Sequence, residues 1–397
     1  MTNVPAAFLQ GGARTYEVLN QKYENILKFT VDQENFTVFP QMVLFFEFVG
    51  NNEYMLAQMP GMLQRFTNTE LFLILDDSYE GLADEEFMQM FKHALEQCPN
   101  IKHWRILSSN AKMKDICNRV FGDSKNFLYF NIHAHLTEYD SLNVPNHNFH
   151  VNTQLRAKKF LCLNRQERLH RILTVDYLLE KDIAKHTFLS CMLGEYAGLI
   201  TNDAAVKWSD NDKSMRKFLD PDLNSLELSQ EQKDRLLCLP LELDVTESLH
   251  HAVKVNMPNL ESYFNQSYFS IITEGDFARG SNRQMFTEKV LKCFLYGHPF
   301  VVIGLPGTLE LLHDIGFITF GNIIDESYDK ELDDEKRLEM CWKEISKLNS
   351  LNMNEMKNVY EKLMPVLEHN YQTYKVINSM PEPSKLANDL ISWYQGD

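Results

Sequence analysis

The feature that most constrains the fold is an alternation of short apolar runs with amphipathic stretches. In the first half, apolar runs of strand length alternate with segments whose apolar residues recur every three or four positions. We expect strands at Met42–Phe48, Leu71–Leu75, Trp104–Leu107 and Phe127–Ile132, and helices at Glu85–Gln97 and Lys112–Phe121. Strands that alternate with helices predict a parallel sheet with helices on both faces.

The alternation stops once and then restarts. Residues 136–158 are polar, rich in Asn and without a period, so we place a domain boundary there. Beyond it we expect strands at 159–163, 186–192, 268–273 and 299–304, helices at 167–182, 287–296 and 309–314, an extended segment at 316–320, and mostly helix from residue 333 onward. The sequence therefore predicts an α/β protein with two doubly wound, Rossmann-like domains, at 1–150 and 156–330. Helices over 331–397 are expected to brace them.

Charge and cysteine usage narrow the possible functions. The formal net charge of −16 argues against broad nucleic-acid binding, so any anionic ligand needs a local cluster of Arg and Lys. The seven cysteines are scattered without a CxxC pair, which favours reduced thiols in the cytoplasm. The first residues lack the pattern of a secretory signal, and no apolar run approaches the ~20 residues of a membrane span. We therefore expect a cytoplasmic protein without a membrane span.

Two strand-to-helix turns in the second half place cations where a helix begins. In the first turn, Asn164 is the expected N-cap, and Glu167 completes a capping box. Arg165, Arg168 and Arg171 then crowd the first two turns of the helix. Cations oppose the helix dipole there, and a bound anion would reverse the sign of that interaction.

The second turn follows the apolar run that ends near residue 273. Thr287 is the expected N-cap, and Glu288 and Lys289 open the helix. Lys289 has the wrong sign for a helix start unless it reaches an anion. Glu288, or Glu274 at the strand end, could accept hydrogen bonds from ribose hydroxyls. In the loop between, we expect Arg283 to be solvated.

These residues resemble the donor-binding half of the α-1,3-fucosyltransferases and their viral and bacterial relatives. The matching pieces are Glu274 at a strand end, Thr287-Glu288-Lys289 opening a helix, and the strand Pro299–Val302. The turn Phe160–Arg171 is similar to the strand–Asn–Arg turn of that family. The resemblance covers roughly residues 159–325, and residues 1–150 match only in general layout.

The resemblance implies the two-domain GT-B fold and an inverting glycosyltransferase. Such an enzyme moves a sugar from a nucleoside diphosphate, here GDP- or UDP-linked, to a hydroxyl of a glycan acceptor. It needs no metal ion and no cofactor besides its donor substrate. By this resemblance, Lys289 would bind the diphosphate together with Arg171 or Arg168, and Glu288 would bind the ribose. Glu274 would lie at the sugar or at the diphosphate loop, and Asn164 would cap the first turn.

The resemblance fails at the general base. Where the family has a Glu after a strand of the first domain, this chain reads Ile106–Asn110, without a carboxylate. Asp76, Asp77 and His133 stand at other predicted strand ends, and we take Asp77 and His133 as the catalytic candidates. His135 follows on the face of His133, but no third metal ligand is evident, so we expect no metal site. The missing Glu leaves open an alternative, a non-catalytic nucleotide-binding or scaffold protein with the same fold.

Overall fold

A computed structural model describes residues 2–10, 27–31, 41–47, 52–63, 69–78, 81, 83–131, 154–164, 168–191, 229–238, 260–277, 283–379 and 385–396. The chain divides into two compact units. Unit 1 comprises residues 1–139, 282–285 and 378–397, and unit 2 comprises residues 140–281 and 286–377. The boundaries expected from the sequence, 1–150, 156–330 and 331–397, stay predictions about folding domains.

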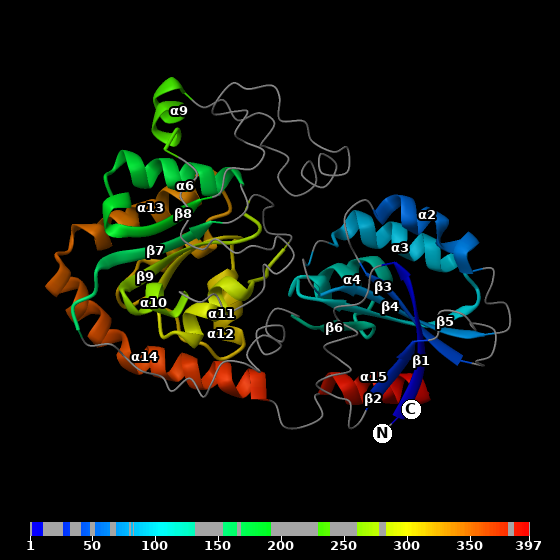
Figure 1. The fold of residues 1–397 in the computed structure, drawn as a ribbon. Coiled ribbons are helices and arrows are strands. Elements are labelled where there is room, and N and C mark those ends of the chain that lie inside the picture. Colours follow the sequence, from blue (N-terminus) through cyan, green and yellow to red (C-terminus); the bar gives the residue numbers. More distant parts are fainter. Residues whose placement is uncertain are drawn as a thin grey trace. The chain divides into compact units, whose positions relative to one another are not determined.

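Unit 1 is built on a parallel sheet, which has six strands among the described residues (Figure 1). In spatial order the strands are β2 (Leu27–Val31), β1 (Thr2–Gln10), β3 (Gln41–Glu47), β4 (Glu70–Asp77), β5 (Ile101–Ser108) and β6 (Phe127–Tyr129). The helices are α2 (Asn52–Leu63), α3 (Glu85–Glu96), α4 (Met113–Phe121) and α15 (Lys385–Gln395). The second strand lies on one side of β1 and the third on the other, which is the doubly wound arrangement.

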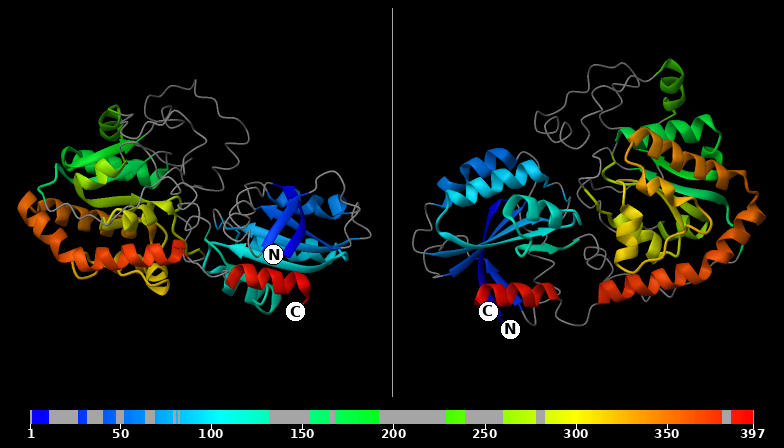
Figure 2. Two further views of the ribbon diagram at one scale, coloured as in Figure 1. Left: turned by 60° about the horizontal axis from the view of Figure 1, so that its bottom comes forward. Right: turned by 180° about the vertical axis from the view of Figure 1, so that it is seen from behind.

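Helices cover both faces of this sheet. α2 and α3 lie on one face, and the C-terminal helix α15 lies on the other (Figures 1 and 2). α15 buries Ala387, Leu390 and Trp393 in a cluster that includes Phe45 and Phe72 of the sheet. The ring centroids of Trp393 and Phe72 are 5.2 Å apart. Segments from opposite ends of the chain therefore form one apolar core.

Unit 2 contains the second parallel sheet, with four described strands in the order β10 (Phe300–Ile303), β9 (Ser267–Thr273), β7 (Lys158–Asn164) and β8 (Thr187–Cys191). Its helices are α6 (Leu169–Glu180), α9 (Gln230–Leu236), α10 (Leu260–Asn265), α11 (Glu288–Leu295), α12 (Thr308–Asp314), α13 (Asp334–Ser350) and α14 (Met353–Ser379), and 3-10 turns occur at Ala184–His186 and Glu326–Lys330. α6 and α13 lie on one face of the sheet and α11 on the other (Figure 1).

The expected α/β architecture with two parallel sheets is confirmed, because every strand pair in the described residues is parallel. Each expected strand from residue 42 onward is present, with ends shifted by a few residues. The sequence patterns do not predict β1, β2 or α2, and the segment at 316–320, predicted to be extended, forms no strand in the described structure.

Candidate functional site

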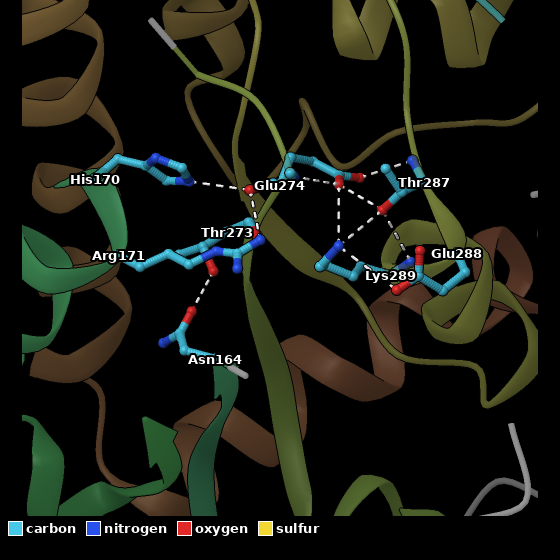
Figure 3. Close-up of polar contacts among 9 residues, drawn as sticks. Asn164, His170, Arg171, Thr273, Glu274, Thr287, Glu288 and Lys289 are labelled. Carbon is cyan, nitrogen blue, oxygen red and sulfur yellow. Dashed lines mark hydrogen bonds and ion pairs between the residues drawn. The ribbon is translucent and has the colours of Figure 1, made fainter. Parts of the chain in front are cut away.

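Most of the candidate binding residues meet at the carboxyl edge of the second sheet. The chain leaves β7 for β8 on one side, and it later adds β9 on the other side, so the connections change direction at β7. In open parallel sheets, ligands bind outside the carboxyl ends of the strands at such a switch point. Asn164 ends β7 and Thr273 ends β9, and residues from the starts of α6 and α11 lie around them (Figure 3).

Asn164 does not cap α6, so that prediction is wrong. The helix begins at Leu169 with Arg168 as its N-cap residue, and the Arg168 side chain makes no capping hydrogen bond. Asn164 instead accepts a hydrogen bond at Oδ1 from the hydroxyl of Thr273, and its Nδ2 donates to the sulfur of Cys162 at 3.3 Å. The partner on β9 holds the Asn164 side chain across the two strands. Arg165 and Glu167 lie outside the described residues.

Arg171 and His170 hold the backbone at the end of β9. Arg171 Nη2 donates to the carbonyl oxygens of Thr273 at 3.2 Å and Glu274 at 2.8 Å. His170 Nε2 lies 3.0 Å from the same Glu274 oxygen, and it must donate because a carbonyl only accepts. Burial, and next the charge of Arg168, lower the pKa of Arg171 to about 10. Burial, followed by the charge of Arg171, holds the pKa of His170 well below its usual range, so the ring is neutral.

The side chain of Glu274 is coordinated at the start of α11. Its Oε1 accepts from the Thr287 N–H at 3.0 Å, and its Oε2 accepts from the Thr287 hydroxyl at 2.5 Å. Oε2 also lies 3.2 Å from the Gly275 nitrogen, which donates to it. Only 4% of the Glu274 side chain is exposed. A carboxylate that is buried this completely depends on such donors.

Lys289 contacts two carboxylates. Thr287 is the N-cap of α11, as expected, and its hydroxyl accepts from the Lys289 N–H at 3.4 Å. The Lys289 ammonium lies 3.7 Å from Glu274 Oε2, 3.5 Å from Glu288 Oε1 and 3.1 Å from the Thr287 hydroxyl. The sequence suggested an external anion for this lysine, and Figure 3 shows that carboxylates of the protein already lie beside it.

Arg168 differs from Arg171 in its surroundings. It is half-buried at the start of α6, and its side chain makes no hydrogen bond or ion pair with any residue that the structure describes. Its charge nevertheless acts on the site, because it lowers the pKa values of both Arg171 and His170. Of the two arginines considered for an anion, Arg171 is bound to backbone carbonyls, whereas the side chain of Arg168 has no polar partner among the described residues.

The catalytic candidates belong to unit 1. Asp77 ends β4, where its Oδ2 accepts from the Ser108 hydroxyl at 2.5 Å and its Oδ1 from the Ala83 N–H at 3.1 Å. These bonds give Asp77 a role in closing the loops at this edge. His133 and His135 lie outside the described residues, so the role of His133 stays a prediction.

Arg283 is buried, so the expectation that it is solvated is wrong. Its Nε donates to the Gly81 carbonyl at 2.8 Å, and the next residue, Gln284, donates its N–H to Asn110 Oδ1 at 3.0 Å. Residues 282–285 thus belong to unit 1, although they stand between β9 and α11 in the sequence. No local pattern predicts these contacts, because the partners are about 170 to 200 positions away.

Three expectations from composition concern the chain as a whole. All seven cysteines are free thiols. None of the described helices is long and apolar enough to cross a lipid bilayer. Among the described residues, no group of three or more His, Cys, Asp or Glu side chains is placed to ligate a metal, and metal-independent chemistry stays a prediction.

Comparison with known proteins adds no relative: no family matches the chain, and no curated protein matches it.

Proposed function

We propose that the chain is an inverting, metal-independent glycosyltransferase of the GT-B type, which moves a sugar from a nucleoside diphosphate to a hydroxyl of a glycan acceptor. The observation that carries the proposal is the pair of cations, Arg168 and Lys289, at the switch point of the second sheet. Both stand where a helix begins, and helix starts favour anions. The resemblance of residues 159–325 to fucosyltransferases points to the same site.

The chemistry follows from the charges. The acceptor oxygen forms a bond to the anomeric carbon while the bond to the diphosphate oxygen breaks, and the acceptor proton passes to a base. Negative charge grows on the departing diphosphate, and Lys289 and Arg168 stabilise it as it develops. Glu288 remains the proposed ligand of the ribose hydroxyls. Asp77 and His133 remain the candidates for the base.

A second candidate function is nucleotide binding without transfer, and one observation favours it. The position where the resemblance requires a Glu holds Ser109, and both carboxylate oxygens of the nearest strand-end acid, Asp77, accept hydrogen bonds from its own unit. A scaffold protein would keep the cationic edge of unit 2 and lack a proton acceptor.

Binding of nucleoside diphosphates tests the shared part of both functions. Thermal stability is measured with GDP, UDP and their sugar conjugates in EDTA, for the wild type and Lys289→Ala. Lys336→Ala is a matched control, because Lys336 also stands in the first turn of a helix of unit 2 but is exposed. We expect one nucleotide to stabilise the wild type and the control, and not Lys289→Ala. Stabilisation by none of them, with the protein folded, would contradict both functions.

Turnover separates the two functions. A glycosyltransferase releases nucleoside diphosphate from the bound nucleotide sugar when an acceptor is present, and at a slower rate to water. Binding without any release over hours would favour the scaffold function.

A further inference from the structure

We infer that Glu274 is an internal competitor for Lys289: its carboxylate occupies an anion position at the start of α11 and weakens the hold of the site on a phosphate-bearing ligand. This inference rests on the proposed function, since it concerns the same site. It assigns Glu274 a role that requires no contact with the ligand.

The contacts of Glu274 are those that a phosphate makes at a helix start. Two backbone N–H groups, of Gly275 and Thr287, and the Thr287 hydroxyl donate to its two oxygens. The ammonium of Lys289 lies 3.7 Å away. Backbone N–H groups, a hydroxyl and a lysine are the donors that hold phosphate groups in helix-terminal sites. The carboxylate therefore fills the position of an anion in the free protein.

Glu274 is the fixed member of the pair. Its backbone oxygen accepts from His170 and Arg171, and its N–H donates to the Ile303 carbonyl at 2.9 Å. Gly304 packs against its stem, because a Cβ there would lie 3.2 Å from both Cβ and Cγ of Glu274. Lys289, in contrast, has a flexible stem and an exposed fraction of 26%. A ligand phosphate would therefore draw Lys289 away from Glu274, and the lost ion pair lowers the net affinity.

The next helix start provides an internal contrast. Asp329 accepts from the N–H groups of Leu309 at 2.9 Å and Glu310 at 3.1 Å at the beginning of α12. No Lys or Arg of the described chain forms an ion pair with Asp329. Both carboxylates thus accept backbone N–H groups where a helix of unit 2 begins, and of the two only Glu274 has an ion-paired lysine among the described residues.

The test compares Glu274→Gln with the wild type by calorimetry, with inorganic pyrophosphate and with the nucleoside diphosphates. Glutamine keeps an oxygen that can accept from Thr287, but it removes the charge that holds Lys289. We expect Glu274→Gln to bind these anions about fivefold more tightly, which is the upper end of what a partly exposed ion pair contributes. In a Lys289→Met background, Glu274→Gln should raise the anion affinity by less than about twofold, because the ammonium for which Glu274 and the ligand compete is then absent.

Asp329→Asn is the matched control, since it makes the same change of carboxylate to amide where no Lys or Arg of the described chain forms an ion pair with the carboxylate. Its affinity for pyrophosphate should equal that of the wild type. Thermal melting verifies that each variant is folded before its affinity is compared.

The outcomes separate the inference from the proposed function. If the wild type binds a nucleoside diphosphate and Glu274→Gln binds it equally or more weakly, the inference is overturned and the function stands. If Glu274→Gln binds pyrophosphate more tightly than the wild type and neither protein binds any nucleotide, the inference stands and the function falls. If neither protein binds any of these anions, both fall.

Discussion

The carboxyl edges of the two sheets have the same architecture and different chemistry. At the edge of unit 1, the strand-end carboxylate of Asp77 accepts from the Ser108 hydroxyl and the Ala83 N–H, which are both neutral donors. At the edge of unit 2, the strand-end carboxylate of Glu274 accepts from Thr287 and has the Lys289 ammonium at 3.7 Å. Both parallel sheets end in a buried carboxylate, and at Glu274 a lysine of the same unit lies beside it.

The largest expected effect concerns the edge of unit 1. Asp77→Ala removes an acceptor of two hydrogen bonds, and each bond to a buried charged group contributes about 1.5–3 kcal/mol. We expect the free energy of unfolding of unit 1 to fall by about 4 kcal/mol in urea denaturation, with nucleotide affinity unchanged. Asp115→Ala, at an exposed site in α4, should change it by less than about 0.5 kcal/mol. A loss of nucleotide affinity in folded Asp77→Ala would contradict the comparison, because the edge of unit 1 would then also contribute to nucleotide binding.

The two arginines of unit 2 should respond in opposite ways. Arg171→Met removes the donor to two backbone carbonyls, so we expect unfolding free energy to fall by about 2–3 kcal/mol. Arg168→Met removes no described contact and should change stability by less than about 0.5 kcal/mol. Its affinity for nucleoside diphosphate should fall by a factor of about 10 to 100, the value of one charge-assisted hydrogen bond. The reverse pattern would show that the ligand contact is made by Arg171.

We expect acidification to lower the free energy of unfolding of unit 2 at a higher pH than that of unit 1. Burial, and next the charge of Arg156, lower the pKa of His298 to about 3, and its ring lies 2.7 Å from both the Ser270 hydroxyl and the Ser267 carbonyl. The unfolded chain binds a proton near pH 6.5 and the folded one does not. The stability that neutral His298 contributes is therefore complete above that pH. It is lost as the pH falls from 6.5 toward 3, by up to about 1.4 kcal/mol per pH unit.

Hydrogen exchange at pH 7 and pH 5 would report each unit separately. His298→Gln should reduce the acid sensitivity of unit 2, and His93→Gln in unit 1, where 72% of the side chain is exposed, should not. Unit 1 opening first on acidification would contradict the prediction.

The smallest expected effect is an increase in stability, caused by the substitution Ser109→Ala. Ser109 Oγ is fully buried at the edge of unit 1 and has no hydrogen-bond partner among the described residues. An unpaired buried hydroxyl costs about 1–3 kcal/mol, so Ser109→Ala should raise the unfolding free energy by about 1 kcal/mol. Thermal melting measures the change. A decrease of similar size would indicate that the hydroxyl has a partner, and would weaken the view that this edge is closed by Asp77.

Local sequence patterns predict the features that are determined by residues close together in the sequence. The N-cap role of Thr287 is predictable because its partner, the N–H of Lys289, is two residues away. The strand and helix alternation likewise follows from periods within ten to fifteen residues. The alternation predicts the α/β architecture, and the N-cap locates the start of α11, which is one of the two helix starts at the site.

Long-range partners explain the failures. Asn164 has the residue type of an N-cap, but Thr273, 109 positions away, binds its side chain instead. Arg283 stands in a polar loop, and Gly81, 202 positions away, accepts its hydrogen bond. The internal anion beside Lys289 follows from the end of β9 lying next to the start of α11, which no sequence period specifies.

The chain passes between the units after residues 139, 281, 285 and 377, so neither unit is one continuous stretch of sequence. A chain cut after residue 377 would lose α15, and with it the cover that Leu390 and Trp393 give to Phe45 and Phe72. Those aromatic side chains would then face water on an open sheet, a surface prone to aggregation. The segment that covers this face of the sheet is therefore synthesised more than 250 residues after β6, so the core of unit 1 cannot close until α15 has left the ribosome.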